Sequence, residues 1–151
     1  MALSDSKRIH KNRLARMRNV KTESLKELYK GGEIVRAYAQ KKIREGAVSG
    51  PGHIPSRPGE FPNANTHELD LGIDVRINPS RLSVSVVSTA PYSAFVELGT
   101  SKMAERPFMR PSLRANKNRL VLGQVQAVQR TIRTFKGSDV RTRANYEDFE
   151  E

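Results

Sequence analysis

Apolar and polar residues alternate most regularly between residues 71 and 86. The apolar positions of this pattern are Leu71, Ile73, Val75, Ile77, Leu82, Val84 and Val86. Alternation with a period of two is typical of strands that bury one face. Asn78-Pro79-Ser80 favours a turn between the two halves, so the pattern predicts an antiparallel hairpin. A two-stranded hairpin is only marginally stable alone, and helices or neighbouring subunits must therefore support it.

Two longer segments carry apolar residues at helical spacing. The first, residues 22–44, has Leu25, Leu28, Val35, Tyr38, Ala39 and Ile43; the second, from Pro111 to about Arg133, has Leu113, Leu120, Val121, Val125, Val128 and Ile132. Both predict long amphipathic helices. Thr22 is a plausible N-cap of the first helix, and Pro111 suits the first position of the second.

Gly31 and Gly32 interrupt the first predicted helix at a cost in helix propensity. They share a face with Leu28 and Val35, so they would permit a sheet or a second helix to approach closely. A kink in the helix is the competing explanation.

The segments outside these elements differ sharply in composition. Residues 1–21 are basic with a thin apolar stripe, which predicts a mobile arm or a helix that orders against a partner. Residues 46–66 hold four prolines and four glycines, which predicts a long loop outside the core that reaches a neighbouring subunit or ring. Residues 134–151 end in Tyr146-Glu147-Asp148-Phe149-Glu150-Glu151, an acidic tail suited to docking on a basic surface of a neighbour.

The chain of 151 residues is most simply one domain, spanning residues 22–133 between the basic start and the acidic tail. We therefore predict an α+β fold, in which two long helices pack on an antiparallel hairpin or small sheet, with a long Pro/Gly-rich loop and extended termini. The net charge is +11, and residues 1–45 contribute +8 of it, which favours an anionic partner. A solvated helix surface would also explain the charge.

The sequence lacks the residue clusters that enzymes and metalloproteins need. It has no cysteine, no Gly-rich phosphate loop, no His-x-x-x-His pair and no acidic cluster before the tail. We therefore predict no catalysis, no metal site and no cofactor, and interpret His53 and His67 as ordinary loop histidines. No apolar run approaches the length of a membrane span, and the start lacks the apolar core of a signal peptide.

The stretch from Pro91 to Asn116 surrounds one carboxylate, Glu97, with apolar residues. Gly99 is expected to end a short helical turn there, because glycine tolerates a positive φ. Residues 106–111, with prolines at positions 107 and 111, predict a stiff, extended connector that presents an aromatic anchor. Glu97 is expected to pair with Arg106 or Arg110. A buried corner and a binding edge explain this stretch equally well.

The same stretch resembles the signature of tail-completion, or neck, proteins of long-tailed bacteriophages. The resemblance is carried by Tyr92-Ser93-Ala94-Phe95-Val96-Glu97-Leu98-Gly99-Thr100, by Arg106-Pro107-Phe108-Met109-Arg110-Pro111 and by the upstream Pro58-Gly59-Glu60-Phe61-Pro62. It spans roughly residues 20–133. Glu105 stands where that family commonly has Ala, and His67-Glu68-Leu69 replaces the usual start of its first strand.

The resemblance implies a structural virion protein that joins head to tail. It would form a homo-oligomeric ring, a hexamer, that is assembled in the host cytoplasm and sits in the neck of the virion. Its partners would be itself, neighbouring neck proteins, the tail tube protein and, non-specifically, the genomic DNA in the lumen. The implied subunit interface comprises Tyr92, Phe95, Glu97, Gly99, Thr100, Arg106, Pro107, Phe108, Arg110 and Pro111, and the implied inter-ring loop comprises Pro58, Gly59, Glu60 and Pro62.

The alternative is a basic nucleic-acid-binding protein, which rests on charge alone because no recognition motif accompanies it.

Overall fold

The computed structural model describes residues 2–48 and 50–134, and the acidic tail predicted from the sequence lies outside these residues apart from Thr134. The elements are α1 (Ala2–Glu45), a short 3-10 turn η1 (Gly50–Gly52), α2 (Glu68–Leu71), β1 (Ile73–Asn78), β2 (Ser83–Ser88), α3 (Ser93–Leu98) and α4 (Met109–Thr134). Two long helices pack with a small antiparallel sheet, as the α+β prediction requires.

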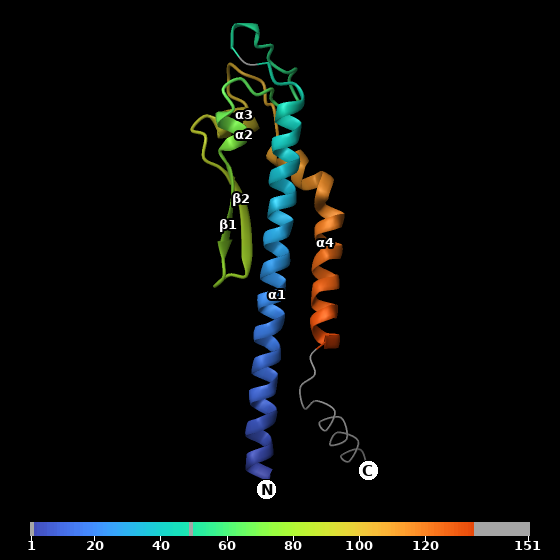
Figure 1. The fold of residues 1–151 in the computed structure, drawn as a ribbon. Helices are drawn as coiled ribbons and strands as arrows, with labels where there is room; N and C mark the ends of the chain where they lie inside the picture. The colour runs from blue at the N-terminus through green and yellow to red at the C-terminus, as the bar shows by residue number, and fades with distance from the viewer. Residues whose placement is uncertain (1, 49, 135–151) are drawn as a thin grey trace.

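Helix α1 is the central element of the fold. The β1–β2 hairpin lies along one side of it, and α4 runs antiparallel to it on another side (Figure 1). A Cβ atom at Gly31 would lie 2.8 Å from Cδ2 of Leu120 in α4, and one at Gly32 would lie 2.7 Å from Cγ1 of Val75 in β1. The adjacent glycines therefore permit two close contacts at once, and α1 continues through both of them. This confirms the close approach that the sequence allowed.

The predicted break in the first helix at Thr22 is wrong. The Thr22 hydroxyl donates a hydrogen bond to the carbonyl of Arg18, 3.0 Å away, from within a continuous helix. Ion pairs one turn apart, such as Asp5–Arg8 and Glu23–Lys26, support the helix on both sides of this point. Residues 2–21 are thus the first turns of α1, because no glycine or proline interrupts them.

The antiparallel hairpin is confirmed, with a register that runs from Ile73 opposite Ser88 to Asn78 opposite Ser83. Its start differs from the prediction, because residues 68–71 form the one-turn helix α2 instead of extending the strand. The side chain of Ile73 is buried, whereas Ile77 near the tip is 46% exposed. The base of the hairpin therefore belongs to the core and its tip does not.

The core gathers where the C-terminal turns of α1 meet α2, the hairpin base and the start of α4. Its buried members are Ala39, Ile43, Ala64, Leu69, Ile73, Ala90 and Phe108.

The expectation that residues 46–66 lie wholly outside the core is wrong for the end of that loop. Ala64 is buried, its N–H donates to the carbonyl of Ile43 at 3.1 Å, and Pro62 is buried as well. Phe61 packs here too, because its ring lies edge-on to the ring of Tyr38 with 6.3 Å between the ring centroids.

Candidate functional site at the corner between α3 and α4

The carboxylate of Glu97, near the end of α3, caps the N-terminus of α4. Its Oε2 atom accepts hydrogen bonds from the backbone N–H groups of Phe108 at 2.7 Å and Met109 at 2.9 Å. Its Oε1 atom accepts one from the backbone N–H of Arg110 at 3.0 Å and one from the Nε of the same residue at 3.1 Å. One side chain thus ties two helices together across eleven residues of sequence.

This cap accounts for the backbone donors that a helix start leaves unpaired. The first N–H groups of a helix have no partner within it. A negative charge placed there also interacts favourably with the positive end of the helix dipole. Glu97 accepts from three such groups, and Pro111 has no N–H to satisfy. Partial burial alone would raise the pKa of Glu97, but the three backbone hydrogen bonds and the Arg110 guanidinium outweigh that effect and lower it.

Arg110 holds the other side of the corner. Its Nη2 donates to the backbone carbonyl of Glu97 at 2.9 Å and to the carboxylate of Glu105 at 2.7 Å. The expected ion pair of Glu97 with one of two arginines is therefore found with Arg110. Arg106 instead donates from its Nε to the carbonyl of Ser56 at 3.0 Å.

Gly99 ends α3 with φ 73° and ψ 179°, and its N–H donates to the carbonyl of Phe95 at 2.9 Å. A Cβ atom there would lie 2.9 Å from both the nitrogen of Glu105 and the carbonyl oxygen of Met103, so only glycine fits. Thr100 then pairs with Met103 through backbone hydrogen bonds and accepts from the N–H of Met103 with its hydroxyl at 3.1 Å. This turn brings residues 105 and 106 back against α3.

The connector and the upstream Pro/Gly segment contact each other, although about fifty residues separate them. The N–H of Gly59 donates to the carbonyl of Glu105 at 2.8 Å, next to the bond between Arg106 and Ser56. The N–H of Arg106 also donates to the carbonyl of Val96 at 2.8 Å. The structure therefore unites the motif segments around positions 58 and 106 into one corner.

Residues 57–60 form a tight turn at the surface of this corner. Pro58 fixes φ at the second position, Gly59 has φ 82° at the third, and the N–H of Glu60 donates to the carbonyl of Arg57 at 3.1 Å. Pro58, Gly59 and Glu60 are exposed, as an inter-ring contact would require, but Pro62 is buried inside its own chain.

The corner has an inner face and an outer face. Phe108 is 1% exposed and belongs to the core, and the half-buried Tyr92 packs against that core. Burial raises the pKa of the Tyr92 phenol. The idea that Phe108 is an anchor offered to a partner is therefore wrong for the single chain. On the outer face Phe95 is 57% exposed and Leu98 is 67% exposed.

The extended connector predicted for residues 106–111 is shorter than expected. Residues 106–108 are in no helix or strand, and α4 already begins at Met109. Pro107 thus precedes the helix, and Pro111 lies inside its first turn instead of opening it. A proline fits within the first turn because no earlier carbonyl requires its missing N–H.

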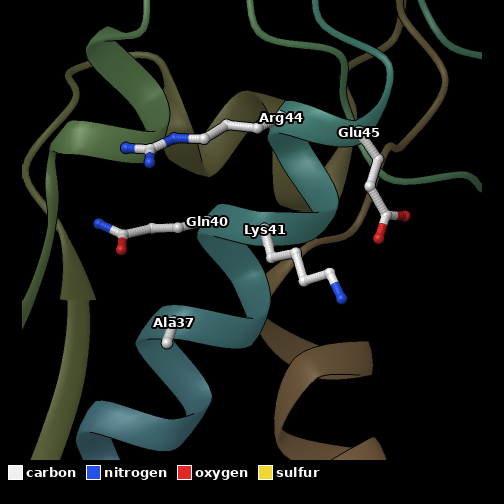
Figure 2. A pocket seen from close by; sticks show the side chains of 5 residues that line it. All are labelled: Ala37, Gln40, Lys41, Arg44 and Glu45. Atoms are coloured by element: carbon white, nitrogen blue, oxygen red, sulfur yellow. The ribbon is translucent and has the colours of Figure 1, made fainter.

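A second polar cluster lies beside the core, where α1 meets α2. The Asp70 side chain is fully buried and is paired with Arg44. His67 Nδ1 lies 3.3 Å from Oδ1 of Asp70, and Gln40 donates to the Asp70 backbone carbonyl at 2.8 Å. Figure 2 shows Arg44 and Gln40 pointing to the same side of α1, while Lys41 and Glu45 point away from it. The surface hollow at these residues is lined by α1 alone.

Within residues 2–48 and 50–134 no group of three His, Cys, Asp or Glu side chains is placed to hold a metal ion. None of the helices described is both long and apolar enough to cross a membrane. No protein-family model, curated protein or solved structure matches this chain.

Sequence reasoning found the residues of the corner but missed what Glu97 does. The capping signal normally sought lies within three residues of a helix start, whereas Glu97 precedes α4 by twelve. The available signal was a lone carboxylate followed by an Arg-Pro-x-x-Arg-Pro start that has no capping side chain of its own.

Proposed function

We propose that this chain is a structural subunit of the neck of a long-tailed bacteriophage, forming a homo-oligomeric ring that completes the tail and joins it to the head. Two kinds of support are available: the ordered motifs that resemble neck proteins, and the outward apolar surface that those motifs carry. The family relationship and the virion location are parts of this proposal.

The observation that carries the proposal is the exposure of Phe95 and Leu98 on a rigid corner. Both lie on one face of α3, three residues apart, and both are more than half exposed. The corner beneath them is fixed by Glu97, Gly99 and Arg110. Large apolar side chains held outward on a rigid element are typical of protein interfaces.

Helix α4 carries a second exposed apolar row. Its buried positions, Ser112 and Ala127, define the face that packs inward. Val121, Val125 and Ile132 are 55%, 47% and 45% exposed, and their spacing of four and seven residues puts them on one other face. An identical neighbour could cover both rows, and closed cyclic symmetry leaves no exposed apolar edge.

The test is assembly of the double variant Phe95→Ser/Leu98→Ser compared with the control Ile77→Ser, which removes an exposed apolar side chain from the hairpin tip. We expect the double variant to lose ring formation and head–tail joining in vitro, while its circular dichroism spectrum stays unchanged. The control is expected to assemble. Normal joining by the folded double variant would contradict the proposed interface.

A nucleic-acid-binding protein is the second candidate, favoured by the N-terminal turns of α1, which are helical, basic and exposed. Binding through those turns would show a log–log salt slope of about −0.9 for each phosphate contacted. Tight, sequence-specific binding that is lost on removing residues 1–21, with joining unaffected, would favour this second function over the first.

A further inference from the structure

The N-terminal part of α1 extends past the rest of the fold. Figure 1 shows α1 continuing beyond the end of α4 and beyond the hairpin. The end of α4 lies beside Asn19, Thr22 and Glu23, where Thr134 and these residues line one surface hollow. Figure 1 shows none of the other described helices or strands beside the N-terminal end of α1.

The face of α1 that α4 covers continues into this projecting part. Gln124 of α4 donates to the carbonyl of Ser24 at 3.1 Å, and Gly31 faces Leu120. Seven residues before Ser24 on the same face is Met17, which is 57% exposed. Leu14, one turn earlier, is 41% exposed.

Basic side chains flank these two apolar residues. Residues 5–21 contain one acidic residue, Asp5, and seven basic ones: Lys7, Arg8, Lys11, Arg13, Arg16, Arg18 and Lys21. A ligand that fits such a face combines several carboxylates with one or two apolar side chains. The last six residues of the sequence, Tyr146-Glu147-Asp148-Phe149-Glu150-Glu151, have four carboxylates and two aromatic rings.

The geometry of α4 places this segment within reach. Because α4 is antiparallel to α1, the last residue of α4, Thr134, lies at the end of that helix nearer the N-terminus of α1 (Figure 1). The thirteen residues from Thr134 to Glu147 can span up to about 43 Å when extended. The twelve residues from Asn19 back to Lys7 cover only about 18 Å of helix.

We propose that residues 146–151 bind the projecting part of α1 in the same molecule, with their carboxylates on its basic side chains and their aromatic rings over Leu14 and Met17. A site joined to its ligand by a short linker meets it at an effective concentration of about 1 mM, so a contact with a Kd of about 0.1 mM is formed some nine-tenths of the time. The segment then shields the basic helix from other anions. This inference does not depend on the proposed function.

Disulfide trapping tests the contact directly, because the natural chain has no cysteine. Met17→Cys/Phe149→Cys is expected to form an intramolecular disulfide under mild oxidation, at least tenfold faster than the control Ile54→Cys/Phe149→Cys. Ile54 is 69% exposed and follows the opposite end of α1, which makes it a matched surface position. A high salt concentration is expected to slow disulfide formation in Met17→Cys/Phe149→Cys but not in the control. Equal rates for the two pairs, or disulfides formed only between molecules, would overturn the proposal.

Binding to a DNA duplex of random sequence supplies an independent readout. Changing the four acidic residues 147, 148, 150 and 151 to their amides is expected to raise affinity about tenfold at low salt, because a site that is free one-tenth of the time binds tenfold more weakly. The control is Glu45→Gln/Glu60→Gln/Glu68→Gln/Asp74→Asn, which makes the same change in net charge at exposed positions away from residues 5–21. An equal gain in both variants, or no gain in the first, would contradict shielding by the tail.

Discussion

Replacing Glu97 by Gln is expected to destabilise the fold well beyond what the loss of a surface ion pair would cost. Glutamine keeps one acceptor oxygen, so it can serve the donors on Oε1 or those on Oε2 but not both sets. At least two donors then lose their partner, at about 1–3 kcal/mol for each donor left buried. The Glu97 side chain is only 12% exposed, so water replaces little of the loss at the part-buried N–H groups of Phe108 and Met109. We predict a decrease of about 2–4 kcal/mol in the free energy of unfolding.

The matched control is Glu105→Gln. Glu105 also accepts from Arg110, at 2.7 Å, but its side chain is 52% exposed and caps no helix. Exposed ion pairs contribute less than about 1 kcal/mol. Urea unfolding followed by circular dichroism measures both variants on the same scale. Surface substitutions usually change the free energy of unfolding by no more than about 0.5 kcal/mol. If the free energies of unfolding of Glu97→Gln and Glu105→Gln differ by no more than about this amount, Glu97 does not cap α4 in the way described.

The same carboxylate predicts the acid sensitivity of the fold. Because the folded-state pKa of Glu97 is lowered from its ordinary value of 4.5, its charge stabilises the fold above that value. This contribution is lost as pH falls through the lower folded-state pKa. Below pH 4.5 the natural chain should therefore lose stability more steeply than Glu97→Gln, which has no charge to lose. Parallel pH profiles of the two proteins would refute the assignment.

Three further substitutions test the packing and pairing of α1. Gly32→Ala should destabilise the fold by about 1 kcal/mol, because overpacking against the stiff side chain of Val75 outweighs the gain in helix propensity. Gly31→Ala should be near neutral, because the end of the Leu120 side chain can move. Thermal unfolding of both variants checks the difference. Arg44→Ala should cost about 3–5 kcal/mol in urea unfolding, because it leaves the fully buried carboxylate of Asp70 without its cationic partner; a loss below about 1 kcal/mol would show that the pair is not structurally important.

The hairpin and the two long helices were predictable because their apolar periods are local and regular. The close approach at Gly31 and Gly32 was one of two explanations that the sequence allowed, the other being a kink. Thr22 misled the prediction because a threonine hydroxyl can cap a helix start or bond back to the carbonyl four residues earlier, and local sequence does not choose between them.

The internal closure of the corner was not predictable from local pattern. The contacts of Glu97 with residues 108–110 and of Arg106 with Ser56 depend on how the turn at Gly99 folds back. Burial of Pro62 was likewise hidden, because a high density of proline and glycine predicts irregular backbone but not its depth. The outward direction of Phe95 follows from the same fold.

The central claim, that this chain is a ring-forming subunit of a phage neck, is tested most directly by an electron cryomicroscopy reconstruction of virions containing it. The account predicts a closed ring of identical copies between head and tail, with Phe95 and Leu98 covered by the adjacent subunit. A single copy in the particle, a position outside the neck, or a ring in which both side chains face solvent would contradict it.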